Sequence, residues 1–209
     1  DLEGSKVWIG IDLSSTIDLT SIGIVGVKDN KFFVFNHNFS PFEHIEEKMK
    51  KEKKPYDLWE KQGFITFTSG YAVDYRVLIK YIQEIEKEYN LEIQEICYDP
   101  WNATILSRDL DELGYITVEI RQGIRTLGEA TKVFREKVYS EEIFHDNNPL
   151  LNFAVLNAIT ISDTNGNFKL DKRKAKERID PLASIINAFV RAMFNQSNKE
   201  LIFEIWNFN

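Results

Sequence analysis

Residues 7–11 read Val-Trp-Ile-Gly-Ile, a compact apolar run that ends at Asp12 and is typical of a buried strand. Two further strands, joined by an Asp-Asn turn dipeptide, are expected at Ser21–Val27 and Lys31–Phe39. Strands that follow one another this closely along a chain pair as an antiparallel meander. The N-terminal part of the chain therefore predicts a three-strand antiparallel meander.

Helical and extended patterns alternate through the rest of the chain. Apolar residues at helical spacing predict helices at Val73–Tyr89, Ala103–Leu113, Leu127–Tyr139, Pro149–Ile161 and from Asp180 onward. Short apolar runs predict strands at Phe64–Thr68, Ile93–Tyr98 and Tyr115–Ile120, with a short edge at Phe168. This order indicates an α/β fold, with one central mixed sheet of the meander plus parallel strands, flanked by helices.

The composition limits the class of protein. The chain has 209 residues, of which 43% are hydrophobic and 28% charged, so a disordered chain is excluded. Cys97 is the one cysteine, which excludes an intramolecular disulfide and a multi-cysteine zinc site. We find no membrane span in the sequence. Residues 1–6 are expected to be a linker or a chain end, 7–194 one domain, and 195–209 a C-terminal tail.

The net charge of −7 argues, as an average, against a nucleic-acid partner, although one face of the molecule could still be basic. Three acids have a shared setting at element ends: Asp12 and Asp99 follow strands, and Asp180 precedes the last helix. Asp99 and Asp180 each precede a proline and helix-like sequence, so either could simply cap a helix. If the strands that end at Asp12 and Asp99 are neighbours, however, the three carboxylates converge and require divalent cations such as Mg²⁺ or Mn²⁺.

Several ordered blocks resemble the nuclease domain of tailed-bacteriophage terminase large subunits. The blocks are IGIDLSST (9–16) with DLT (18–20), YDPW (98–101), DTNGN (163–167) with Lys172 and Lys174, and ERIDP (177–181). The resemblance runs from about Val7 to about Met193. It implies an RNase H-like fold, two bound Mg²⁺ or Mn²⁺ ions, and Asp12, Asp99 and Asp180 as catalytic residues and metal ligands that cleave double-stranded viral DNA during genome packaging.

The same resemblance implies the surroundings of the domain. In that family the nuclease follows a packaging ATPase, and this chain has no Gly-x-x-x-x-Gly-Lys-[Ser/Thr] motif. We therefore expect an ATPase domain elsewhere in a full-length protein, a portal protein and a small terminase subunit as partners, and the cytoplasm of a bacterial host as the location.

Other residues are candidates for supporting roles. Some members of the family place a further metal-proximal residue three positions before the last aspartate, so Glu177 is a candidate ligand, or else a partner of Lys174 or Arg178. Asp18 and Ser14 are expected to support the loop after Asp12. Phosphate contacts, which position DNA without reading its sequence, are expected from five cations: Arg121, Arg125, Lys172, Arg173 and Lys174.

The stretch 42–72 is interpreted as an insertion. Its lysines at 48–54 form a solvated positive segment, and within Lys54–Tyr75 we expect a β-hairpin beside the active site that guides DNA. We expect Trp101 to pack into the core rather than stack on a base, and His145 to be a structural residue in a loop.

Three alternative functions remain at this point. Another RNase H-like nuclease of the resolvase or transposase type would share the carboxylate geometry. An actin-like kinase or ATPase also begins with an acid after its first strand, but it requires glycine-rich phosphate loops, and the 10 glycines here include no Gly-Gly pair. A non-catalytic interaction domain would show no stabilisation by Mn²⁺.

Overall fold

The computed structural model describes residues 2–14, 19–172, 174–175 and 178–195. Its central sheet confirms the predicted mixed α/β class. Three strands form the expected antiparallel meander, with turn residues of positive φ at Asp29 and Asn30: β1 (Lys6–Asp12), β2 (Thr20–Lys28) and β3 (Lys31–Pro41). Four more strands pair in parallel with members of the meander or with each other: β4 (Ile65–Thr68), β5 (Glu92–Tyr98), β6 (Thr117–Glu119) and β7 (Ile143–His145).

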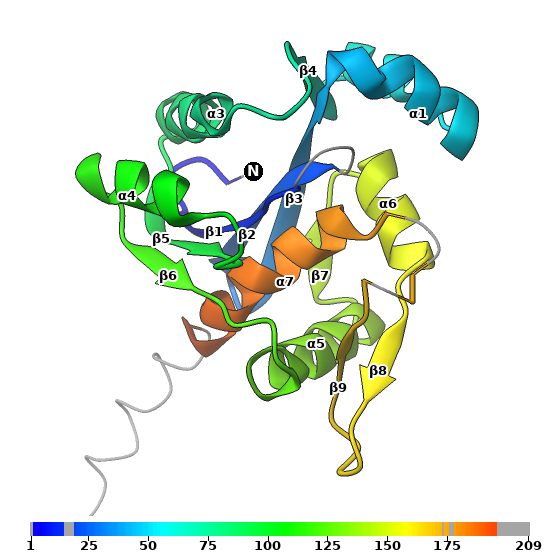
Figure 1. The fold of residues 1–209 in the computed structure, drawn as a ribbon. Helices are drawn as coiled ribbons and strands as arrows, with labels where there is room; N and C mark the ends of the chain where they lie inside the picture. The colour runs from blue at the N-terminus through cyan, green and yellow to red at the C-terminus, as the bar shows by residue number, and fades with distance from the viewer. Residues whose placement is uncertain (1, 15–18, 173, 176–177, 196–209) are drawn as a thin grey trace, which may run out of the picture.

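The strand order is β4-β3-β2-β1-β5-β6, and β7 pairs with the N-terminal part of β3. Helices cover both faces of this sheet (Figure 1). On one face lie α3 (Tyr75–Glu88) and α4 (Thr104–Glu112); on the other lie α5 (Ile124–Tyr139), α6 (Pro149–Leu156) and α7 (Asp180–Ala192). A 3-10 turn, η2 (Met193–Asn195), follows α7.

Side-chain alternation along β1 decides which residues face which layer. Val7, Ile9 and Ile11 pack in the core under α3 and α4, whereas Trp8 packs with α7 on the opposite face. Because successive side chains of a strand point to opposite faces, Gly10 and Asp12 lie on the α7 face with Trp8. The acid at the end of β1 thus faces the last helix of the domain.

Helix α7 lies close against the sheet because two glycines leave room for it. A Cβ atom added to Gly10 would overlap the carbonyl oxygen of Ser184, and one added to Gly23 would lie 2.6 Å from the amide nitrogen of Ile185. Backbone atoms cannot move aside as flexible side chains can, so any larger residue at these positions requires α7 to shift. The glycines therefore set the distance of α7 from β1 and β2.

The prediction of a β-hairpin within Lys54–Tyr75 is wrong. The 42–72 stretch contains a 3-10 turn, η1 (Phe42–His44), two helices, α1 (Ile45–Glu52) and α2 (Tyr56–Lys61), and then β4, which pairs in parallel with β3. Parallel pairing needs a crossover, and the two helices supply it. A hairpin does occur further along the chain, where β8 (Thr160–Ser162) and β9 (Phe168–Leu170) pair around the Asn-Gly turn.

Other differences from expectation are local. The helix predicted at Pro149–Ile161 ends at Leu156, because β8 begins four residues later. His145 lies in β7 rather than in a loop. Trp101 is 54% exposed and does not pack into the core, and Lys48, expected in solvent, is 2% exposed.

Candidate active site

The ends of β1 and β5 bring two of the predicted aspartates together. The strands are parallel neighbours, with Ile11 opposite Tyr98, so Asp12 and Asp99 follow at the same sheet edge. Asp12 is the last residue of β1 and is 2% exposed, whereas Asp99 is half-buried just beyond β5. The expectation that these two strands are neighbours is confirmed, and the carboxyl edge of the sheet is the usual place for a site in such folds.

The third aspartate is brought to the same edge by α7. Asp180 is the first residue of this helix. Asn187, about two turns further along the helix, donates a hydrogen bond of 3.0 Å to the carbonyl oxygen of Ile11. The capping expectation is wrong for both Asp-Pro pairs. Ile179 is the N-cap of α7 and Ala103 that of α4, and no side-chain capping bond is found at either among the described residues. One oxygen of Asp99 does accept the Trp101 N–H, at 3.0 Å.

Burial and like charge act together on these acids. Burial is the main cause that raises the pKa of Asp12 to about 7; the charge of Lys172 opposes this shift, and the charges of Asp180 and Asp99 add to it. Burial likewise raises the pKa of Asp180, opposed by Lys172 and Arg178. The charges of Asp180 and Asp99 therefore both act on the Asp12 carboxylate, and such a field stabilises bound cations.

A lysine is the cation that Asp12 holds. The Nζ atom of Lys172 lies 2.5 Å from both carboxylate oxygens of Asp12, and the Coulombic attraction of Asp12, Asp180 and Asp99 raises the pKa of Lys172 against the effect of burial. The Asp12 side chain is 3% exposed and that of Lys172 is 40% exposed. Lys172 was predicted to contact DNA phosphate; here its partner is a predicted catalytic acid.

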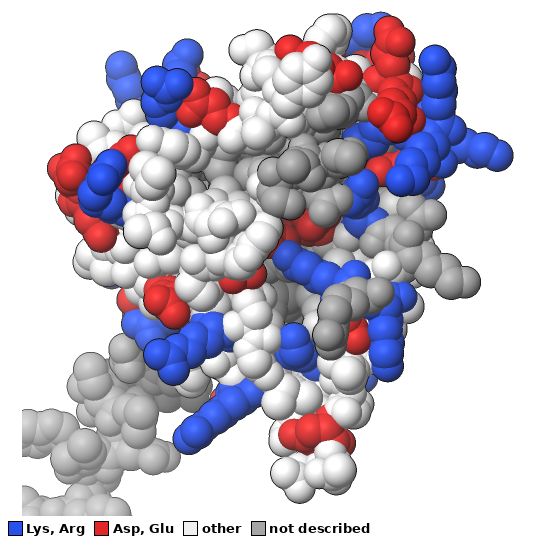
Figure 2. All heavy atoms as spheres, viewed as in Figure 1, with Lys and Arg blue, Asp and Glu red and all other residues white. Residues whose placement is uncertain are grey.

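A hollow of about 150 Å³ lies beside this ion pair. Asp99, Lys172 and Asn187 line it, together with Asp171, which follows β9 and is 4% exposed. Figure 2 shows acidic side chains recessed near the middle of this face, with Lys and Arg side chains beside them. Asp171 and Asn187 were not predicted for the site. The sequence signal that could have revealed Asn187 is a polar residue among the apolar positions of this helix.

The other predicted residues take different positions. Arg121, Arg125 and Lys174 are exposed, and the Nε atom of Arg121 lies 3.8 Å from Glu119. Ser14 donates its N–H to the hydroxyl of Thr20 at 3.1 Å, which fits the expected support of the loop after β1. Asp18, Arg173 and Glu177, and nearly all of the 195–209 tail, lie outside the described residues.

Buried charges from α1 also reach this region. Lys48 donates to the Ser40 hydroxyl at 3.4 Å, and burial lowers the pKa of Lys48 to about 8 despite the nearby charges of Glu52 and Asp180. Arg178, two residues before α7, donates twice to Glu52, at 3.1 and 3.0 Å. Helix α1 is thereby tied to the segment that leads into α7.

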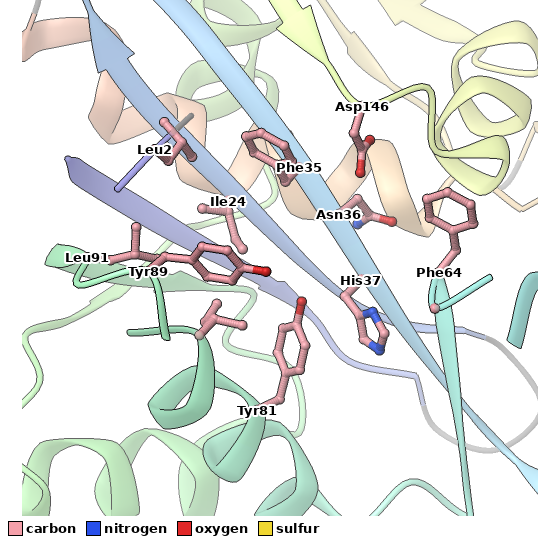
Figure 3. A pocket seen from close by; sticks show the side chains of 12 residues that line it. Leu2, Ile24, Phe35, Asn36, His37, Phe64, Tyr81, Tyr89, Leu91 and Asp146 are labelled. Atoms are coloured by element: carbon pink, nitrogen blue, oxygen red, sulfur yellow. The ribbon is translucent and has the colours of Figure 1, made fainter. Parts of the chain in front are cut away.

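A separate hollow of about 440 Å³ lies away from the three aspartates, between β3 and α3 (Figure 3). His37 lies at its edge, where its ring stacks on that of Tyr81 with centroids 4.5 Å apart and its Nε2 lies 2.8 Å from the Thr66 hydroxyl. Burial lowers the pKa of His37 to about 4. The tyrosines 81 and 89 project into the hollow, so it is an aromatic pocket without the acid cluster of the site.

The donor chemistry at the sheet edge fits a hard divalent cation, since carboxylate oxygens are the preferred ligands of Mg²⁺ and Mn²⁺. The arrangement is nevertheless an ion-paired one: within the described ranges, no group of three or more His, Cys, Asp or Glu side chains is placed to hold a metal ion. Lys172 instead neutralises Asp12.

None of the helices in the described part of the chain has the length and apolar character that a membrane span requires.

Comparison with known proteins places this chain in a family. The family model for the terminase large subunit, endonuclease domain, matches residues 1–196. The terminase large subunit of Enterobacteria phage HK97 is 32% identical over 183 residues, which are 86% of this chain and 36% of that protein. Protein YmfN of Escherichia coli K12 is 27% identical over 95% of this chain and 46% of its own length. The chain thus spans less than half the length of these relatives.

Solved structures agree with the sequence comparison. The crystal structure of the HK97 large terminase superposes with a TM-score of 0.83 at 30% identity, over 91% of this chain and 40% of that one. The large terminase nuclease of thermophilic phage G20c, in a crystal structure with bound magnesium, has a TM-score of 0.58 at 9% identity, over 90% and 82% of the two chains; this likeness supports the RNase H-like fold. By the match over nearly its whole length, the chain belongs to the family of terminase large subunit endonuclease domains.

Proposed function

We propose that this chain is a divalent-metal-dependent endonuclease that cleaves double-stranded viral DNA during genome packaging. The observation that carries the proposal is the buried carboxylate of Asp12, whose pKa is raised to about 7 partly by the charges of Asp180 and Asp99. Like charges gathered in a buried site are costly unless cations are bound there. Family membership supports the nuclease activity, and the magnesium in the G20c nuclease supports a divalent cofactor.

Asp12, Asp99 and Asp180 are the residues that would hold the metal, with two ions of Mg²⁺ or Mn²⁺ as the expected number. When bound, such ions lower the pKa of an attacking water and neutralise charge on the phosphate. The chain's own residues supply rigidity. The amide of Asn187 bonds the Ile11 carbonyl and also accepts from Gln122 Nε2 at 3.1 Å, so the end of β1 and the middle of α7 are fixed to one another.

Exposed cations around the site supply the contacts with DNA. Arg121 and Arg125 follow β6, and Lys174 lies on the same segment as Lys172. Such side chains bind phosphate without reading bases, which suits cleavage with little sequence preference. The ATPase domain of a longer protein, the portal protein and the small terminase subunit are the proposed partners, in the cytoplasm of a bacterial host.

Cleavage of supercoiled plasmid in Mn²⁺ tests this function. We expect Asp12→Asn, Asp99→Asn and Asp180→Asn each to lower the rate at least about a hundredfold, because each removes a charged ligand. The matched control is Asp29→Asn, the same substitution in the β2–β3 turn at the opposite end of the strands, where asparagine also tolerates the positive φ. Folded Asp12→Asn or Asp180→Asn protein that cuts at the rate of the control would refute the assignment.

A further inference from the structure

The contact between Lys172 and Asp12 joins residues 160 positions apart in the sequence. Both oxygens of the Asp12 carboxylate lie 2.5 Å from the ammonium, which is the geometry of a cation centred on the carboxylate. Asp99 and Asp180 also attract this ammonium. Lys172 therefore has the electrostatic position that a metal ion would take among the three acids.

A lysine and a metal ion cannot both occupy this position. Asp12 is almost wholly buried, and the ammonium already contacts both of its oxygens, so a cation that binds Asp12 must first displace the lysine. The ammonium also repels any further cation from the two oxygens that it already contacts. The pairing of Lys172 with Asp12 is thus in direct competition with metal binding.

Lys172 has a route out of the site. Its side chain is 40% exposed. The residues just before it, at the end of β9, are held in place by hydrogen bonds. Lys169 donates to the Gln122 carbonyl at 2.8 Å, and the N–H of Asp171 donates to the Ile159 carbonyl at 2.8 Å. The side chain of Lys172 can therefore rotate away from Asp12 while the β8–β9 hairpin keeps its place.

We propose that Lys172 is a built-in substitute for the metal ion: it neutralises Asp12 in the metal-free protein and must leave before a divalent cation binds. The inference rests on the proposed function, in that it takes Asp12 as a metal ligand. Its consequence is that the metal-free site is held in a stable, inactive ion pair, and that the apparent affinity for metal is lowered by the cost of breaking this pair.

Calorimetric titration with Mn²⁺ tests the competition. We expect Lys172→Gln to bind Mn²⁺ about tenfold more tightly than the unsubstituted chain, because a charge-assisted contact need not be broken. Lys174→Gln is the matched control, since it removes the same charge two residues further along and should change the affinity less than twofold. Equal or weaker Mn²⁺ binding by Lys172→Gln would overturn the proposal.

Lysine acetylation read by mass spectrometry supplies a second measurement. Lys172 should be protected in the metal-free chain, and it should become reactive in Asp12→Asn without metal and in the unsubstituted chain once Mn²⁺ is added; Lys174 should react equally throughout. Continued protection of Lys172 in the Mn²⁺-bound chain would refute displacement. Tighter Mn²⁺ binding by Lys172→Gln, together with no DNA cleavage by the unsubstituted chain, would refute the proposed function alone. No Mn²⁺ binding by either protein would overturn both.

Discussion

Replacing Gly10 by alanine tests whether close packing of α7 holds the domain together. The added Cβ would overlap the Ser184 carbonyl oxygen and lie 2.6 Å from the Ala188 amide nitrogen. Both are backbone atoms of α7, so the helix must move as a unit by enough to restore an ordinary contact. Helix α7 is the most extensively buried helix of the described chain, and its apolar side chains form much of one core. A shift of α7 therefore disturbs many contacts at once.

We expect Gly10→Ala to lower the free energy of unfolding by about 3 kcal/mol, at the upper end of the usual cost of overpacking. For a domain of this size that corresponds to a fall in Tm of about 6–12 °C. Gly128→Ala is the matched control. Its added Cβ would meet neighbours at 3.6–3.8 Å, an ordinary contact distance, and alanine favours the interior of α5 by up to about 1 kcal/mol.

Thermal unfolding and urea titration of the two variants decide the matter. The expected order of Tm is Gly128→Ala at or slightly above the unsubstituted chain and Gly10→Ala well below it. A Gly10→Ala variant that unfolds within about 2 °C of the unsubstituted chain, a shift of at most about 1 kcal/mol in a domain of this size, would show that α7 adjusts freely to the sheet. That result would also remove the packing argument for the position of Asp180.

Two further predictions concern buried ionisable side chains other than the three aspartates. Burial lowers the pKa of His37 from 6.5 to about 4. Between these two pH values the unfolded chain binds a proton that the folded chain does not bind. The free energy of unfolding should therefore fall by about 3 kcal/mol as the pH drops from 6.5 to 4. Urea titrations at several pH values should show a shallower loss for His37→Gln, and an identical slope would contradict the assignment. Glu52→Gln should lower the free energy of unfolding by roughly 3 kcal/mol, since it removes the charge that Arg178 contacts twice in a largely buried pair. The exposed pair of Glu112 with Arg108 gives the comparison, and Glu112→Gln should cost under about 0.5 kcal/mol.

Local patterns were sufficient to predict most of the sheet and its helices. The apolar run at 7–11 and the spacing of apolar residues in α3 depend on neighbours along the chain, so periodicity revealed both. The hairpin was misplaced because β4 is a four-residue parallel strand, whose partner lies across two helices and leaves no mark in the nearby sequence. Strand β7 was missed for the same reason, since it has three residues and pairs with distant β3.

The sequence predicted which acids of the candidate site lie at the ends of neighbouring elements. It did not predict which side chains form ion pairs there. That Asp12 and Asp99 share an edge follows from strand adjacency, which the chain order suggested. The ion pair of Lys172 with Asp12 depends instead on how the segment after β9 reaches the end of β1, which is a tertiary property. The charge run at 169–178 indicated solvent or phosphate, and the burial of an acid 160 residues away decided otherwise.

The stability of the fold and the geometry of the site are set by the same face of one strand. Gly10 and Asp12 are two residues apart on β1 and therefore point the same way. The glycine lets α7 approach the sheet, and the acid meets the start of that helix at the strand's end. A larger residue at Gly10 would displace the helix that carries Asp180, so it should disturb the packing of α7 and the arrangement of the three aspartates together. A chain of net charge −7 can thus gather three of its acids at one sheet edge, and its average charge gives no sign of that arrangement.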